Sequence, residues 1–150
     1  MAEDYVPTEV LPAEQRATFM GYDRGDGRVG TRNMIGIFIT VNCSATVARK
    51  ISAYFDQERL ASYANVDGVV AFVHEQGCGM EMTGEPMDLL RRTLAGYIRH
   101  PNIGGALVLS LGCERNNLVQ FFEEQGLEAG TTFSRSSALA SKATGFPIAK

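Results

Sequence analysis

The fold of this chain is decided by one apolar run, Ile35-Gly36-Ile37-Phe38-Ile39-Thr40-Val41, which leads into Asn42-Cys43-Ser44. Two later runs have the same form. Val69-Val70-Ala71-Phe72-Val73 leads through His74 to Gly77-Cys78-Gly79, and Ala106-Leu107-Val108-Leu109-Ser110-Leu111 leads to Gly112-Cys113-Glu114. Short runs that are apolar almost throughout are typical of strands buried on both faces of a parallel sheet.

Helical patterns separate these runs. Strands predicted near 34–41, 68–73 and 105–111 alternate with helices predicted near 45–55, 85–99 and 115–125. Ser44 is the expected N-cap of the first helix. The alternation predicts an α/β fold, a three-layer Rossmann-like domain with a mostly parallel sheet. Right-handed crossovers then bring the three strand exits to one edge of the sheet, where ligands bind in such folds.

The domain is predicted to occupy residues 21–133. Residues 1–20 lack a clear period and are expected to be a linker or arm, and residues 134–150 a tail that is disordered or truncated. Residues 21–33 contain several glycines and arginines and are expected to form a loop before the first strand. The segment 131–137 could begin a fourth strand.

Composition narrows the class of protein. The chain has 150 residues, a net charge of −3, 45% hydrophobic and 21% charged residues, which is ordinary for a soluble globular domain. Nucleic acid and membrane partners are not expected, because there is no basic excess and no long apolar span. The acidic N-terminus lacks the pattern of a signal peptide, and three scattered cysteines do not form a disulfide framework, so we expect a cytoplasmic protein.

The three cysteines predict a metal site at the shared edge. A single cysteine at a strand end is more often a small buried core residue, but Cys43, Cys78 and Cys113 occupy equivalent places after successive strands. Thiolates are soft ligands that favour zinc, iron or iron–sulfur clusters. His74 and Glu114 lie beside these cysteines and are the candidate catalytic groups, although structural hydrogen bonding and an ordinary helix-start carboxylate are the alternatives.

Several polar residues are candidates for binding an anionic substrate. The arginine-rich loop contributes Arg28, Thr31 and Arg32, since guanidinium groups recognise carboxylates, with a solvated loop as the alternative. Asn42 and Ser44 precede the first helix, whose amides favour an anion. His100 precedes Pro101-Asn102 and is expected to be a turn residue at the opposite edge.

These motifs together resemble the altronate/galactarate dehydratase family. The resemblance rests on blocks that follow one another in the family's order: 19–22, 26–33, 40–44, 65–70, 74–79, 100–102 and 111–114. It implies an iron-dependent lyase that removes water from a sugar acid to give a 2-keto-3-deoxy acid, with iron as Fe²⁺ or a cluster. Under this resemblance Arg28, Thr31, Arg32 and Asn42 face the substrate.

The resemblance also implies a longer enzyme. Family members are much longer than this chain, so we expect its partners to be a small-molecule sugar acid and the remaining domains, with a homo-oligomer left open. The family includes a sulfolactate sulfo-lyase large subunit, and that activity is one alternative. A non-catalytic α/β interaction module is another. A nucleotide-binding domain is poorly supported without Gly-x-Gly-x-x-Gly, and a thiol redox protein lacks Cys-x-x-Cys.

Overall fold

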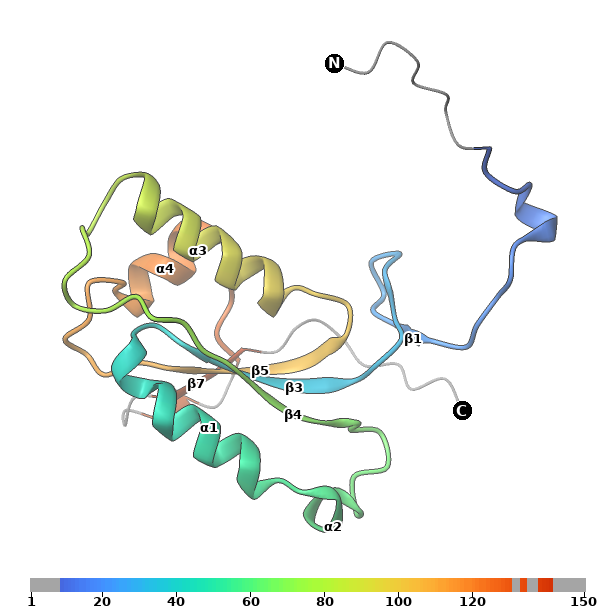
Figure 1. Ribbon diagram of the computed structural model, residues 1–150, viewed down its shortest axis with the longest axis horizontal. Helices are drawn as coiled ribbons and strands as arrows, with labels where there is room; N and C mark the ends of the chain where they lie inside the picture. Colours follow the sequence, from blue (N-terminus) through green and yellow to red (C-terminus); the bar gives the residue numbers. More distant parts are fainter. Residues whose placement is uncertain (1–8, 131–132, 135–137, 142–150) are drawn as a thin grey trace.

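The centre of the molecule is a five-stranded sheet with the order β4-β3-β5-β7-β6 (Figure 1). The computed structural model describes residues 9–130, 133–134 and 138–141, and all statements on side chains concern residues 9–130. Part of the predicted arm (1–8) and most of the predicted tail lie outside the described residues. The strands are β3 (Met34–Ile39), β4 (Gly68–Phe72), β5 (Ile103–Leu109), β6 (Phe133–Ser134) and β7 (Ala138–Ser141).

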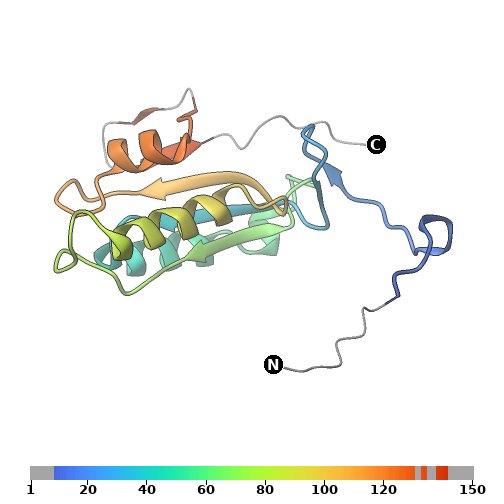
Figure 2. The same cartoon turned by 90° about the horizontal axis from the view of Figure 1, so that it is seen from above.

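Three of these strands are parallel, as their apolar sequences predict. β3 lies in the middle and pairs with β4 in the register Met34↔Gly68 to Phe38↔Phe72. On its other side β3 pairs with β5, with a register shift between Met34 and Ile35. In Figure 2 the arrows of β4 and β5 point the same way. The carboxyl ends of β3, β4 and β5 therefore share one edge, as predicted.

The sheet as a whole is mixed rather than mostly parallel, which corrects the prediction. β7 pairs antiparallel with β5, and β6 pairs antiparallel with β7. A short connection joins β6 to β7, which accounts for the antiparallel pairing of these two strands with each other. β6 falls within the segment that could begin a fourth strand.

Helices cover both faces of the parallel strands (Figure 1). Helices α3 (Glu85–Ile98) and α4 (Leu118–Gln125) pack on the face that presents Phe38, Ala106 and Val108. Helix α1 (Ala45–Tyr54) packs on the other face through Ala48, against a cluster that includes Ile37, Ile39 and Leu109. Alternate residues of each strand point to opposite faces, so each apolar run supplies both cores.

The local boundaries differ from the predicted ones in three places. A 3₁₀ turn, η2 (Asn42–Ser44), precedes α1, and Ser44 already has helical angles, so its side chain makes no cap hydrogen bond and the predicted capping role is wrong. The loop 21–33 contains a two-stranded hairpin, β1 (Tyr22–Asp23) and β2 (Val29–Gly30). Short helices η1 (Ala13–Gln15) and α2 (Gln57–Leu60) were not predicted.

No helix among the described residues has both the length and the apolar character needed to cross a membrane.

Candidate functional site

The candidate site is the edge where β3, β4 and β5 end, which we call the cysteine edge and define as residues 42–44, 74–79 and 110–117. Hydrogen bonds to backbone carbonyls hold its three segments together. The amide of Asn42 donates to the carbonyl of Gln76 at 2.9 Å. Arg115 Nε donates to the carbonyl of Cys78 at 3.2 Å. The exits of β3 and β4, and those of β4 and β5, are thus in direct contact.

All three cysteines are exposed on this edge. The alternative that they are small core residues is therefore excluded. Cys43 Sγ donates to Asn42 Oδ1 at 3.5 Å. Within the described part of the chain, no three His, Cys, Asp or Glu side chains are grouped so that they could hold a metal ion. The fold brings the thiols to one edge but does not gather them into a complete ligand set.

His74 joins the exit of β4 to the end of β3. Its Nε2 lies 3.0 Å from the carbonyl oxygen of Ile39, and its Nδ1 accepts from the amide of Gln76 at 3.2 Å. This pattern assigns the neutral tautomer with the proton on Nε2, because a carbonyl oxygen can only accept. Both ring nitrogens are engaged, the Nδ1 side by the longer bond. His74 therefore lies on the predicted edge and orders it.

The Glu114 carboxylate is buried and accepts four hydrogen bonds. Oε1 accepts from Thr40 Oγ1 at 2.9 Å and from Ser110 Oγ. Oε2 accepts from the amides of Gly112 at 2.6 Å and Leu111 at 3.2 Å. Two side chains and two amides therefore fill the acceptor positions of one carboxylate.

These hydrogen bonds also control the charge of Glu114. Burial of the carboxylate opposes its ionisation, but the hydrogen bonds from Ser110, from the backbone and from Thr40 outweigh that effect, so the pKa of Glu114 lies below its ordinary value. A carboxylate with a lowered pKa and four donors has little tendency to take up a proton. The hydrogen bonds of the Glu114 carboxylate are those of a group that holds the loop after β5 in place.

Two residues of this edge, Asn116 and Arg115, were missed by the sequence analysis, as was a third, Arg91 of α3, that contacts the edge. Asn116 is buried, and its Oδ1 accepts from Nε of Arg91 at 3.0 Å. Arg91 is itself buried between α3 and α4 and pairs with Glu124. Arg115 is exposed and takes part in no ion pair with the described residues. The sequence Cys113-Glu114-Arg115-Asn116 carries no signal of this arrangement, because the alternation of exposed and buried side chains appears only in the structure.

Two predicted substrate residues lie on the cysteine edge. Asn42 is exposed there, beside Cys43. Ser44 is on the same turn but is only 4% exposed. Asn42 is therefore accessible to a ligand at this edge, whereas Ser44 is not.

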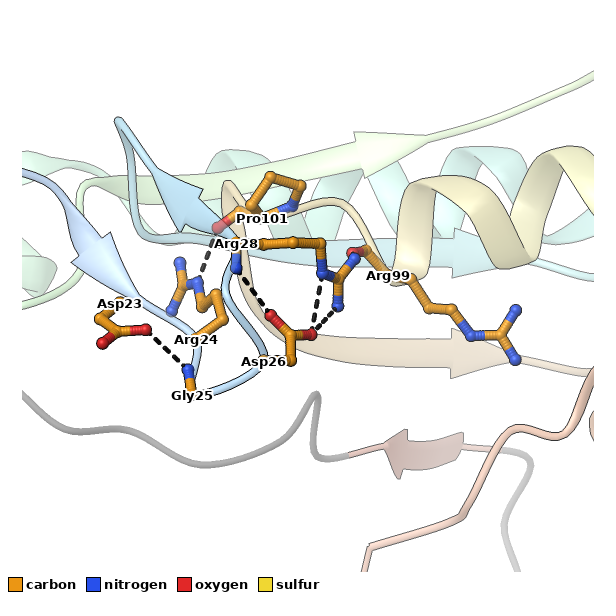
Figure 3. A network of polar contacts seen from close by, with 7 residues as sticks. All are labelled: Asp23, Arg24, Gly25, Asp26, Arg28, Arg99 and Pro101. Atoms are coloured by element: carbon orange, nitrogen blue, oxygen red, sulfur yellow. Dashed lines mark hydrogen bonds and ion pairs between the residues drawn. The ribbon is translucent and has the colours of Figure 1, made fainter. Parts of the chain in front are cut away.

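The other predicted substrate residues lie at the opposite end of β3. Arg28, Thr31 and Arg32 precede this strand, and the cysteine edge follows it, about 20 Å away for six residues. There, residues 21–33 contact residues 99–102, and we call this set of contacts the clasp (Figure 3). The fold does not bring the arginine-rich loop and the cysteines into one site.

The clasp uses its polar groups internally. Arg28 Nε donates to Asp26 at 2.8 Å, and this bond places the pKa of Asp26 below its ordinary value. Arg28 also donates to the carbonyl of Arg99, and Arg24 Nε donates to the carbonyl of Pro101 at 2.7 Å. Figure 3 shows the Arg24 guanidinium bonded to Pro101, and the Arg28 guanidinium bonded to Asp26 and lying beside Arg99. Their donors are engaged by groups of the protein.

Asn102 completes the clasp. Its Oδ1 accepts from the amides of Thr31 at 2.8 Å and Arg32 at 3.2 Å. Its carbonyl accepts from the amide of Met34, where β3 begins. His100 Nδ1 accepts from the amide of Asn102 at 3.1 Å, which confirms the predicted turn role of His100.

A separate cavity of about 370 Å³ lies on the α1 face of the sheet. Its lining is apolar apart from one tyrosine and includes Ile35, Ile51, Phe55, Tyr63 and Leu107. Such a lining offers no convergent polar groups for a sugar acid. The cysteine edge therefore remains the candidate site.

Comparison with known proteins identifies the family. The family model described as "D-galactarate dehydratase/Altronate hydrolase, second domain" matches residues 21–146. The chain is 37% identical to altronate dehydratase of Bacillus subtilis over 74% of this chain and 22% of that protein. It is 39% identical to galactarate dehydratase (L-threo-forming) of Escherichia coli over 71% of this chain and 21% of that protein.

A third relative is named for a different activity. The chain is 30% identical to the (2R)-sulfolactate sulfo-lyase subunit beta of Chromohalobacter salexigens over 63% of this chain and 21% of that protein. No solved structure matches the chain. The chain spans about a fifth of the length of the curated relatives it matches. It belongs to the D-galactarate dehydratase/altronate hydrolase family and corresponds to the second domain of those proteins.

Proposed function

We propose that this chain is one domain of a longer sugar-acid dehydratase and that its cysteine edge faces the active site. The observation that carries the proposal is the match to the dehydratase family over residues 21–146, combined with three exposed thiols on the sheet edge where ligands bind. The substrate class is an altronate- or galactarate-like acid. We also propose that the fold is a three-layer Rossmann-like variant extended by β6 and β7.

The reaction removes a proton from C2 of the acid and hydroxide from C3, and the enol then rearranges to a 2-keto-3-deoxy acid. We propose His74 as the proton acceptor: Nδ1 carries the one basic lone pair of the ring, and the 3.2 Å hydrogen bond that it accepts from the Gln76 amide would be exchanged for the substrate proton. Asn42 is exposed on the same edge and can hydrogen-bond a substrate hydroxyl.

Arg115 is the proposed partner of the substrate carboxylate. Its Nε is fixed on the carbonyl of Cys78, and its two remaining nitrogens have no acidic partner among the described side chains. A guanidinium group can bind a carboxylate through two parallel hydrogen bonds. This role replaces the one expected for Arg28 and Arg32, which lie at the clasp.

Iron remains part of the proposal for the whole enzyme, on the strength of the family resemblance. When bound, iron would act as a Lewis acid on the acid's oxygens. The described residues do not form a complete ligand set, although soft, exposed thiols are present. We therefore assign no step of the reaction in this chain to iron and place at least part of its ligand set outside this chain.

The test uses the longer protein that contains this chain, purified without oxygen in the presence of iron. Elimination of water from altronate and galactarate would be followed by the appearance of the keto acid. Arg115→Ala is expected to raise KM about tenfold or more, and Arg92→Ala, an exposed arginine of α3, is the matched control. Absence of keto acid from both substrates would contradict the proposed function.

A sulfo-lyase is the second candidate, because the sulfolactate enzyme subunit is among the relatives. Sulfolactate in the same assay separates the two candidates. Release of sulfite without any keto acid from the sugar acids would favour the sulfo-lyase. Iron and sulfide analysis of the same preparation distinguishes mononuclear iron from a cluster, and a preparation that is active without iron would refute the cofactor proposal.

A further inference from the structure

Residues 113–116 of the turn that follows β5 present two side chains outward and hold two inward. Cys113 and Arg115 are exposed, while Glu114 and Asn116 are 9% and 1% exposed. A charged side chain is rarely buried in a surface turn unless its hydrogen bonds are satisfied. This alternation places the Glu114 carboxylate on the inner side of the turn that exposes Cys113.

Glu114 holds this turn from inside. Its Oε2 accepts from the amides of Leu111 and Gly112, which immediately precede Cys113. Gly112 has a φ of 90°, a conformation that L side chains rarely adopt, so the backbone beside the cysteine is bent into an unusual shape. The two amide hydrogen bonds stabilise that shape.

Glu114 also ties the turn to the neighbouring strand. Its Oε1 accepts from Thr40 Oγ1 on the segment that leads from β3 to Asn42 and Cys43. Ser110, at the end of β5, donates to the same oxygen. One carboxylate therefore fixes the exits of β3 and β5 relative to each other.

We propose that Glu114 is a positioning residue, not a proton-transfer group, and that its carboxylate fixes the orientation of Cys113 at the cysteine edge. The proposal rests on the proposed function in treating this edge as the active-site face. Because four donors surround the carboxylate, no oxygen is left to take a proton from a substrate. The same bonds set the backbone that carries Cys113, so loss of the carboxylate changes the environment of the thiol.

The experiment compares Glu114→Gln with Glu75→Gln in the present chain. Glu75 is an exposed carboxylate on the same edge, and its side chain makes no hydrogen bond with the described residues, so Glu75→Gln makes the same chemical change without breaking such contacts. Two quantities are measured in folded protein: hydrogen exchange of the Gly112 amide, and the rate at which Cys113 reacts with N-ethylmaleimide relative to Cys78. Glu114→Gln should speed the exchange about tenfold and raise the rate ratio about threefold.

A second variant separates positioning from charge. Ser110→Ala with Thr40→Val keeps the Glu114 charge but removes two of its donors. The same direction of change is expected in both quantities. If Glu114→Gln does not fold, this pair supplies the result.

Unchanged exchange and an unchanged rate ratio in folded Glu114→Gln would overturn the proposal, as would faster exchange without any change in the ratio. Equal changes in Glu75→Gln would overturn it too. These measurements need no substrate, so failure of the dehydratase assay leaves them interpretable.

Discussion

The two ends of β3 use polar side chains in opposite ways. At the clasp, Arg24, Arg28 and Asn102 direct their polar groups at backbone and at Asp26, so that the chain satisfies them itself. At the cysteine edge, Glu114 and Asn116 are buried and bonded, while three thiols and Arg115 are left exposed. The arginine-rich loop therefore has a structural role, and the exposed reactive side chains lie at the other end of β3.

The largest expected effect tests the clasp as architecture. A Cβ at Gly30 would lie 2.2 Å from the carbonyl oxygen of Pro101, which is backbone and cannot move alone. Gly30→Ala should lower the free energy of unfolding by about 3 kcal/mol, the upper range for forced overpacking. Urea unfolding followed by circular dichroism measures it.

The matched variant lies on the cysteine edge. Nothing lies within 4 Å of a Cβ at Gly79, so Gly79→Ala should change the free energy of unfolding by less than about 0.5 kcal/mol. If the free energy of unfolding fell equally in Gly30→Ala and Gly79→Ala, the clasp would not be packed more tightly than the cysteine edge.

The next effect concerns pH at the cysteine edge. The pKa of Glu114 is lower in the folded chain than its ordinary value of about 4.3, so its ionisation stabilises the fold above that pH. The contribution is lost as the pH falls through the folded-state pKa, because the unfolded chain binds the proton more readily. Glu114→Gln should cost about 2 kcal/mol at pH 7, and the difference from the unsubstituted chain should shrink at pH 3.

Asp26 provides the contrast from the clasp. Its pKa is also lowered, by the hydrogen bond from Arg28, but this carboxylate is exposed and solvent screens it. Asp26→Asn should show a weaker pH dependence in the same urea titrations. If Asp26→Asn changed the pH dependence of the free energy of unfolding as strongly as Glu114→Gln, the difference in exposure between the two carboxylates would not explain their contributions.

Asn102 gives the third effect. Its Oδ1 accepts from two amides, so Asn102→Ala should lower the free energy of unfolding by about 1.5 kcal/mol. Asn102→Asp keeps the acceptor oxygen and should restore most of that loss, as judged by thermal unfolding at pH 7. Maleimide rates at Cys113 should stay unchanged in both variants, since the clasp lies at the far end of β3. Altered maleimide rates would show that the clasp and the cysteine edge are coupled.

Much of the fold was predictable from the sequence because the apolar runs are unambiguous. The three parallel strands, the helices between them and the shared edge of the cysteines follow from local pattern and from the handedness of crossovers. The antiparallel addition of β7 to β5 was not predictable, since residues 134–145 carry little periodicity.

The polar contacts of the clasp and of the candidate site were harder to predict, because they join residues remote in sequence. Thr31 meets Asn102 across 71 positions, and Thr40 meets Glu114 across 74. No local pattern reveals that an arginine-rich loop is already bonded to a distant turn. Conversely, Glu114 resembles an exposed helix-start carboxylate in sequence, and only tertiary structure supplies the four donors that bury it.

Arg28→Ala has the smallest expected effect and separates the two interpretations of the arginine-rich loop. The Arg28 and Asp26 side chains are 46% and 39% exposed, so their ion pair adds little to stability, and the thermal midpoint should fall by about 2 °C. In the longer enzyme, KM for the sugar acid should be unchanged, because the guanidinium lies at the far end of β3 from the thiols. Arg115→Ala, at the cysteine edge, is the comparison that should raise KM. If Arg28→Ala raises KM tenfold while the thermal midpoint hardly moves, the clasp binds substrate, and the division between an architectural end and a reactive end fails.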